Sequence, residues 1–210
     1  MPSYSCKAVV IKHTKINDSD RIIKLLSAEY GVVDAIVKGA RKITSKKGGN
    51  IDLINLVSVQ ISKGKSLDIV TEAEVINDYI DLKKDLFKIG LAYYLTEILS
   101  HFEYDNASGS KLFNRLVLTL DRIDKSKSKL TSVLVLKSFE LGYLEMNGYK
   151  MPRPEIKEVQ ELFDILSTNN LENLLKIKYN AEMVKKLSDV IQDYSENVLE
   201  KKFKKVNLMV

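Results

Sequence analysis

A change in hydrophobic period near Asp81 constrains the fold more than any other feature of this chain. Over the first eighty residues, apolar side chains come in short runs or at every second position, and after Asp81 they recur every three to four residues. The first pattern is typical of strands and the second of amphipathic helices. The 210 residues can form two small domains. The sequence therefore predicts an α+β multidomain protein, with a β domain over residues 1–80 and an all-helical domain over 81–210.

Five strand-like segments fill the first domain. They are Cys6–Lys12, Asp20–Ser27, Val32–Val37, Leu53–Ser62 and Leu67–Val75. The second segment fits a helix or a strand on pattern alone, but its close connection to the third favours a strand. Lys63-Gly64-Lys65 is typical of a hairpin turn. Five short strands suit a small closed barrel, and the OB fold is the leading choice.

The second domain shows several helical stretches. Phe87, Leu91, Leu95, Ile98 and Phe102 fall at helical spacing, with enough further apolar residues to predict a central helix. We expect Asn106–Ser110 to form a loop. Further helices are predicted over residues 112–123, 130–143, 155–166, 171–177 and 181–203. Lys201, Lys202, Lys204 and Lys205 lie at the end of the last predicted helix. Favourable interaction with the helix dipole is sufficient to explain them. Alternatively, they form a second patch that binds nucleic acid or an acidic peptide.

The segment from Lys38 to Gly49 is a basic, glycine-containing loop within the β domain. Between Ile36 and Ile51 there are five cations and no acidic residue. Closely spaced cations displace the counterions condensed on a phosphate backbone, and glycine allows close approach or a positive φ. An isolated charge run is more often a solvated loop. The neighbouring barrel strands favour a nucleic-acid interface instead.

The predicted DNA-binding residues belong to this loop, the hairpin and the second strand. They are Lys38, Arg41, Lys42, Lys46 and Lys47 as one wall, extended by Lys63, Lys65, Arg21 and Lys24. Tyr30 is the only aromatic residue well placed near a turn, so base stacking is expected to be sparse. We therefore expect binding dominated by phosphate contacts, with weak sequence selectivity.

Residues for catalysis or metal binding do not form a recognisable set. Cys6 is the only cysteine, which excludes an internal disulfide and a four-thiolate zinc site. His13 and His101 lie far apart, and the carboxylates are scattered. Gly64-Lys65-Ser66 resembles the end of a P-loop, but Val59 stands where that motif needs glycine. We expect no enzyme activity, no cofactor and no metal. Without a membrane-length apolar run, we also expect no membrane partner and a cytoplasmic location.

The order of motifs resembles the DNA repair protein RecO family of recombination mediators. The resembling segments are His13 to Gly31, Val37 to Ser45, Gly90–Leu99, Leu136–Tyr143 and Tyr194 to Met209. The resemblance implies an N-terminal OB domain, a helical domain and often a cysteine zinc module after Gly142-Tyr143. Leu144 to Pro154 contains no cysteine, so the zinc module is expected to be absent.

The resemblance also implies a function and partners. It implies binding of single- and double-stranded DNA, annealing of complementary strands, and loading of RecA together with RecR and single-strand-binding protein. RecA is then an indirect partner, and the location is nucleoid-associated. The acidic tail of single-strand-binding protein is expected on the helical domain, with Arg115, Arg122, Lys137, Lys185 and Lys186 as candidate rim cations. The alternatives are an RNA-linked OB-fold module and a non-catalytic protein-interaction scaffold.

Overall fold

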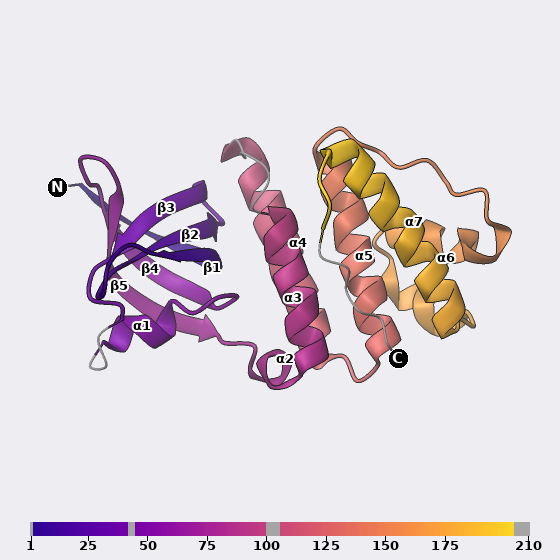
Figure 1. The fold of residues 1–210 in the computed structure, drawn as a ribbon, viewed down its shortest axis with the longest axis horizontal. Helices are drawn as coiled ribbons and strands as arrows, with labels where there is room; N and C mark the ends of the chain where they lie inside the picture. The colour runs from indigo at the N-terminus through magenta and orange to yellow at the C-terminus, as the bar shows by residue number, and fades with distance from the viewer. Residues whose placement is uncertain (1, 42–44, 100–105, 204–210) are drawn as a thin grey trace. The chain divides into compact units, whose positions relative to one another are not determined.

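The computed structural model describes residues 2–41, 45–99 and 106–203, shown in Figure 1. The chain forms two compact units that alternate along the sequence. The first contains Met1–Ile80 and Thr96–Val117, and the second contains Asp81–Leu95 and Leu118–Val210. Sequence analysis drew a single boundary at residue 80, whereas the contacts assign part of the following helices to the first unit.

Five strands close into a barrel with the order β1-β2-β3-β5-β4 (Figure 1). They are β1 (Ser3–Lys15), β2 (Arg21–Ser27), β3 (Gly31–Val37), β4 (Leu56–Ser62) and β5 (Asp68–Asn77). Strands β3 and β5 are parallel and share only two pairs, Ala35 with Asp68 and Ile36 with Ile69. The other neighbours are antiparallel. The predicted fold class, a five-stranded N-terminal barrel followed by helices, is confirmed.

The barrel core consists of alternate residues along β1 to β4, together with Val70 and Ala73 of β5. Cys6, Ala8 and Val10 of β1 face Ile23 and Leu25 of β2 within one buried cluster. A register shift between Val10 and Lys12 marks a bulge at this point of β1. Such a bulge bends a strand and increases its twist, which suits a strand that must close a barrel.

A short helix, α1 (Lys46–Asn50), follows β3 where the sequence predicted only a loop. Its N-cap is Ser45, whose side-chain oxygen accepts a hydrogen bond from the Gly48 amide at 3.2 Å. At Gly48 a Cβ atom would lie 2.2 Å from the carbonyl oxygen of Ala40, so only glycine fits. The side-chain amide of Asn50 (Nδ2) donates to the carbonyl of Ala73 in β5 at 2.8 Å. The helix is thereby held against the barrel.

The remaining helices largely follow the predicted segments. They are α2 (Ile80–Lys84), α3 (Leu86–Leu99), α4 (Asn106–Lys125), α5 (Lys129–Met146), α6 (Lys157–Ser167), the 3₁₀ helix η1 (Leu171–Lys176) and α7 (Ala181–Leu199). Two predictions were wrong. Asn106–Ser110 starts α4 and is not a loop, and α7 ends at Leu199 because Glu200 has a left-handed backbone with φ 51°. Lys201 and Lys202 therefore follow the helix, and Lys204 and Lys205 lie outside the described residues.

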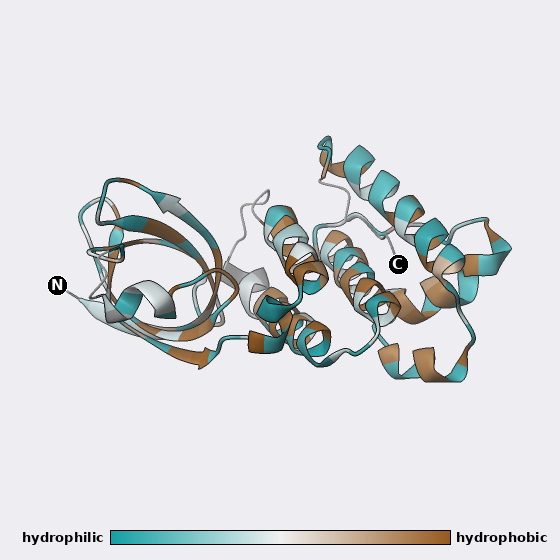
Figure 2. Ribbon diagram, turned by 60° about the horizontal axis from the view of Figure 1, so that its bottom comes forward, coloured by the Kyte–Doolittle hydropathy of each residue, from teal (hydrophilic) through white to brown (hydrophobic). Residues whose placement is uncertain are grey.

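The central helix of the second unit is α5 and not α3. All residues from Ser132 to Leu144 are buried, and α5 contacts both α6 and α7. On α3, by contrast, Leu86 is 88% exposed and Tyr93 is 56% exposed. Figure 2 shows brown, apolar segments between teal, polar ones along the strands and helices. None of the helices within the described ranges has the length and apolar composition needed to cross a membrane.

The two adjacent glycines of α1 provide a matched test of this packing. We predict that Gly48→Ala lowers the free energy of unfolding by about 1–3 kcal/mol, because the new methyl group meets a fixed carbonyl. Gly49→Ala should leave stability unchanged or raise it by up to about 1 kcal/mol, since a Cβ there meets nothing within 4 Å. Urea denaturation of both variants checks this. Equal destabilisation by the two substitutions would contradict the close contact.

Candidate nucleic-acid interface

Two loops meet at one end of the barrel and present cations there. The first spans residues 16–20 between β1 and β2, and the second spans 38–41 after β3. The Gly39 amide donates to Asp20 Oδ1 at 2.8 Å, and the Arg41 amide donates to the Ser19 carbonyl at 3.0 Å. Arg41 Nη1 donates to the Asn17 carbonyl at 2.7 Å. These bonds fasten the two loops together, and Lys38 and Arg41 remain exposed.

Asp20 is the carboxylate on which this loop junction depends. The Gly39 amide is the main cause that lowers the pKa of Asp20, followed by the hydrogen bond from the Asn17 side chain. Asn17 also accepts from the amides of Ser19 and Asp20, which fixes the turn. The carboxylate therefore lies amid cations with its own oxygens already bonded. Asp20 was not among the site residues predicted from the sequence, so this role was missed.

Arg21 adds a third cation next to the junction. It lies at the start of β2, opposite Lys15 of β1 and Val37 of β3. Its Nε atom is buried, and this atom has no hydrogen-bond partner within the described part of the chain. Burial lowers the pKa of nearby His13, and the positive charge of Arg21 lowers it further. His13 itself is half-buried within β1.

The remaining predicted site residues fall into four groups, of which Lys63 and Lys65 form the last. Lys47 is close to the junction because the next residue, Gly48, packs on Ala40. Lys24 forms an ion pair with Asp34 at 2.8 Å, and a partly exposed pair of this kind contributes about 0–1 kcal/mol. Lys42 lies outside the described residues, and the side chain of Lys46 is not described. We call Arg21, Lys38, Arg41 and Lys47 the loop cluster.

Lys63 and Lys65 lie at the opposite end of the barrel from the loop cluster. Their hairpin adjoins the start of β1, where Ser3 pairs with Ser62, whereas the loop cluster adjoins its end at Lys15. Lys63 donates to Asp68 Oδ2 at 3.1 Å. Lys65 is exposed near the tip of the hairpin. Among the predicted residues that the structure describes, Lys63 and Lys65 are thus not continuous with the loop cluster.

The outer side of β4 and β5 has the opposite electrostatic character. Gln60 pairs with Glu72 and Ser58 with Glu74, and all four side chains are exposed. The carboxylates on this surface repel a phosphate backbone, and the neutral polar groups carry no charge that attracts it. The barrel is therefore electrostatically asymmetric, and an anionic strand is favoured at the loop cluster.

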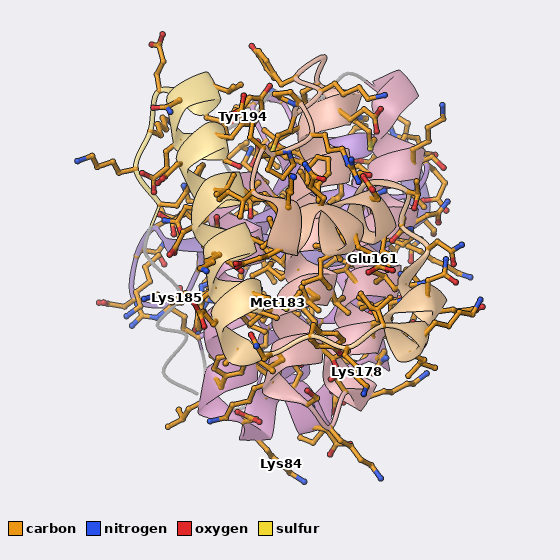
Figure 3. All side chains as sticks on the ribbon, turned by 90° about the vertical axis from the view of Figure 1, so that its right-hand side faces the viewer. Lys84, Glu161, Lys178, Met183, Lys185 and Tyr194 are labelled. Atoms are coloured by element: carbon orange, nitrogen blue, oxygen red, sulfur yellow. The ribbon has the colours of Figure 1, made fainter. Side chains whose placement is uncertain are left out.

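The cations predicted to form a rim on the helical domain do not converge in the second unit. Lys137 is buried, and its Nζ donates to Glu140 Oε2 at 2.8 Å and to the Tyr94 hydroxyl at 3.4 Å. Arg122 donates to Asn169, and Lys186 pairs with Glu158 and Glu182. Lys185 is exposed on α7 (Figure 3). Arg115 belongs to the first unit.

The second unit instead contains a cavity of about 550 Å³ between α5, α6 and the segment that joins them. Leu141, Phe163, Met151 and Pro152 supply apolar lining, and Lys150 and Arg153 add cations. Arg153 forms two hydrogen bonds with the carboxylate of Asp164, and Lys150 lies 3.5 Å from Glu145. The cavity thus combines an apolar floor with cations that already have exposed acidic partners.

Comparisons with known proteins identify the relatives of this chain. The family model for the N-terminal domain of recombination protein O matches residues 1–79. The DNA repair protein RecO of Dehalococcoides mccartyi strain BAV1 is 32% identical over 155 residues, or 74% of this chain. That of strain 195 is 30% identical over 168 residues, or 80% of this chain. The chain is related to the RecO family.

The RecO resemblance seen in the motifs is therefore confirmed. A third RecO relative, from Trichodesmium erythraeum, is 32% identical over 126 residues. The chain spans 59% and 64% of the length of the two Dehalococcoides RecO proteins. Among the described residues, no group of three or more His, Cys, Asp or Glu side chains is arranged to hold a metal ion. The absence of the zinc module remains a prediction.

The loop junction predicts a specific effect of removing Asp20. In Asp20→Ala, the amides of Gly39 and Arg41 should exchange with solvent faster, because their loop loses its anchor. Asp18→Ala in the same loop is the control, since Asp18 is exposed and the Gly39 and Arg41 amides bond to Asp20 and Ser19 instead. Hydrogen exchange of the two variants checks this, and unchanged exchange in Asp20→Ala would contradict the proposed anchor.

Acid should release the same junction. Because the folded pKa of Asp20 is depressed, its stabilising effect is complete above the unfolded value of about 3.9 and is lost as pH falls through the folded value. The amide resonance of Gly39 should therefore titrate with a midpoint below about 3.9, and Asp20→Asn should abolish that transition. A midpoint at or above the ordinary Asp value would contradict the bond.

Proposed function

We propose that this chain is a DNA-binding recombination mediator in DNA repair. The observation that carries the proposal is the loop cluster, whose Lys38 and Arg41 are exposed at one barrel end, whereas Glu72 and Glu74 are exposed on the β4–β5 surface. The relatives are named DNA repair protein RecO, which agrees with this assignment. In this proposal the barrel binds single- and double-stranded DNA mainly through phosphate contacts. No catalytic step is assigned to any residue.

The proposal extends to a sequence of actions on DNA. The chain would anneal complementary strands and, with RecR, help load RecA onto strands coated with single-strand-binding protein. Cations that neutralise two strands at once reduce their mutual repulsion, which is the physical requirement for annealing. Annealing of coated complementary strands with and without the protein tests this step. Equal annealing rates in the two reactions would remove it from the proposal.

Binding to single-stranded DNA should weaken steeply with salt. Contacts to about three to five phosphates predict that log K falls with log[salt] with a slope of roughly −2 to −4. The double variant Lys38→Ala, Arg41→Ala should flatten the slope by about 1.4, since each single-strand contact contributes about 0.7. Lys7→Ala is the matched control, because exposed Lys7 lies beside Ser58 on the β4 side of β1.

Fluorescence anisotropy with a labelled oligonucleotide, measured over a range of salt concentrations, gives these slopes. A wild-type slope near zero would overturn the interface. A competition between DNA and RNA of the same sequence separates the RNA-linked alternative, and absence of binding to either polymer would favour a protein scaffold.

We further propose that the acidic tail of single-strand-binding protein docks in the cavity beside α5 and α6. The resemblance to RecO implies that this tail is acidic and ends in apolar residues. Its binding site therefore needs an apolar floor and nearby cations. Leu141 and Phe163 supply the floor, and Arg153 and Lys150 can exchange their exposed carboxylate partners for those of a peptide. This position replaces the rim expected from sequence, whose cations are dispersed or buried.

Charge-reversal variants should distinguish docking in this cavity from docking on α7. We predict that Lys150→Glu with Arg153→Glu weakens binding of a labelled acidic tail peptide to the full chain at least tenfold. Lys185→Glu is the control, because Lys185 is exposed on α7 and does not line the cavity. Loss of binding in the Lys185 variant alone would move the site to α7, and equal binding by all proteins would refute both positions.

A further inference from the structure

Two tyrosines form a ring pair at the barrel end opposite the loop cluster. Tyr4 of β1 and Tyr30 of the β2–β3 turn have ring centroids 4.6 Å apart and planes inclined by 55°. The sequence predicted little base stacking, because Tyr30 was the only aromatic residue expected near a turn. The antiparallel pairing of β1 with β2 folds the turn back to the start of β1, which brings the second ring beside it.

The Tyr4 ring is fixed in place. Its hydroxyl donates to Asp68 Oδ2 at 2.7 Å, and its ring packs against the barrel core. Burial and the bond to Asp68 both raise the pKa of Tyr4, so it stays a hydrogen-bond donor. Burial alone would raise the pKa of Asp68, but the bonds from Tyr4, Lys63 and Gly64 outweigh it and lower that pKa. Tyr4 thus gives Tyr30 a rigid support.

Tyr30 remains open to solvent on this support. Tyr30 is 41% exposed, and its backbone amide donates to Ser27 Oγ at 3.1 Å. A tyrosine has only two side-chain torsions, so little conformational entropy is lost when a flat ligand covers its ring. An exposed ring with a fixed backbone is a suitable surface for a planar group.

The charges around the ring pair suit a nucleotide. Lys63 Nζ lies 5.0 Å from the Tyr4 ring centroid, and Lys65 is exposed near the tip of the same hairpin. The nearby acids are already bonded: Asp68 as described, and Glu29 by the Lys7 amide and Ser27 Oγ. Lys63 and Lys65 can therefore contact phosphates beside a base on Tyr30.

We infer that Tyr30, supported by Tyr4, is a stacking site for an unpaired DNA base, with Lys63 and Lys65 contacting the adjoining backbone. The inference rests on the proposed DNA binding and adds to it a preference for single strands, because a base inside a duplex cannot leave its stack without cost. The β-strand β3 has seven residues and spans about 20 Å. A single DNA strand can therefore reach both this site and the loop cluster.

The test compares Tyr30→Leu with the wild-type chain on two labelled strands, one with ordinary bases and one abasic. Tyr30→Leu should weaken binding of the ordinary strand about 5- to 150-fold, the range for loss of one stacked base. The slope of log K against log[salt] should not change, because no ionic contact is lost. Affinity for the abasic strand should be the same for both proteins.

Two variants serve as controls. Tyr30→Phe keeps the ring and should bind like the wild type. Tyr149→Leu removes a tyrosine with the same 41% exposure from the second unit and should have no effect. Equal binding of the ordinary strand by Tyr30→Leu and wild type would overturn the stacking site alone. An equal loss on the abasic strand would also overturn it. Failure of the wild type to bind either strand would overturn the DNA-binding proposal and the stacking site together.

Discussion

The double pairing of β1 is the constraint on which the barrel and its surface depend. This 13-residue strand pairs with β4 from Ser3 to Val9 and with β2 from Ala8 to Lys15. No flat strand can serve both neighbours in a closed barrel, and the bulge between Val10 and Lys12 supplies the necessary bend. Because side chains alternate along a strand, the bulge also resets which residues face inward beyond it. His13 and Lys15 are positioned beside Arg21 by this shift.

The two ends of β1 position the two proposed DNA contacts. At its end, the loop junction holds Lys38 and Arg41 beside the Asp20 carboxylate, which accepts from the Gly39 amide, while Arg41 Nη1 donates to the Asn17 carbonyl. At its start, the Tyr4 ring supports Tyr30 and lies under Lys63. Cations at the first position act through phosphate charge and depend on salt, whereas a ring at the second acts through base surface and does not. One barrel therefore offers two physically separable kinds of contact.

The buried polar group of the second unit shows why a charge in sequence is a poor guide to a surface. Glu140 accepts from Lys137, from Tyr94 at 3.0 Å and from Ser195, so the ion pair is surrounded by hydrogen-bond donors. Removing one partner of such a pair leaves an uncompensated buried charge, which costs more than the pair itself contributes. Phe203, beyond the end of α7, packs edge-on against the Tyr94 ring and helps to exclude water from this group.

Local patterns in the sequence determined the five strands, most of the helices and the RecO resemblance, because apolar period and turn chemistry depend on near neighbours. They also marked the glycines of the Lys38–Gly49 loop as positions of close approach or positive φ, which the structure shows at Gly39 with a φ of 69° and at Gly48 beside Ala40, but not at Gly49. Tertiary structure alone decided that α5 is central, that Lys137 is buried and that Lys63 lies far from Lys38. It also brought Tyr4 beside Tyr30 across 26 positions in sequence. These outcomes depend on barrel closure and helix packing, in which contacts join residues whose spacing along the chain carries no signal of their proximity.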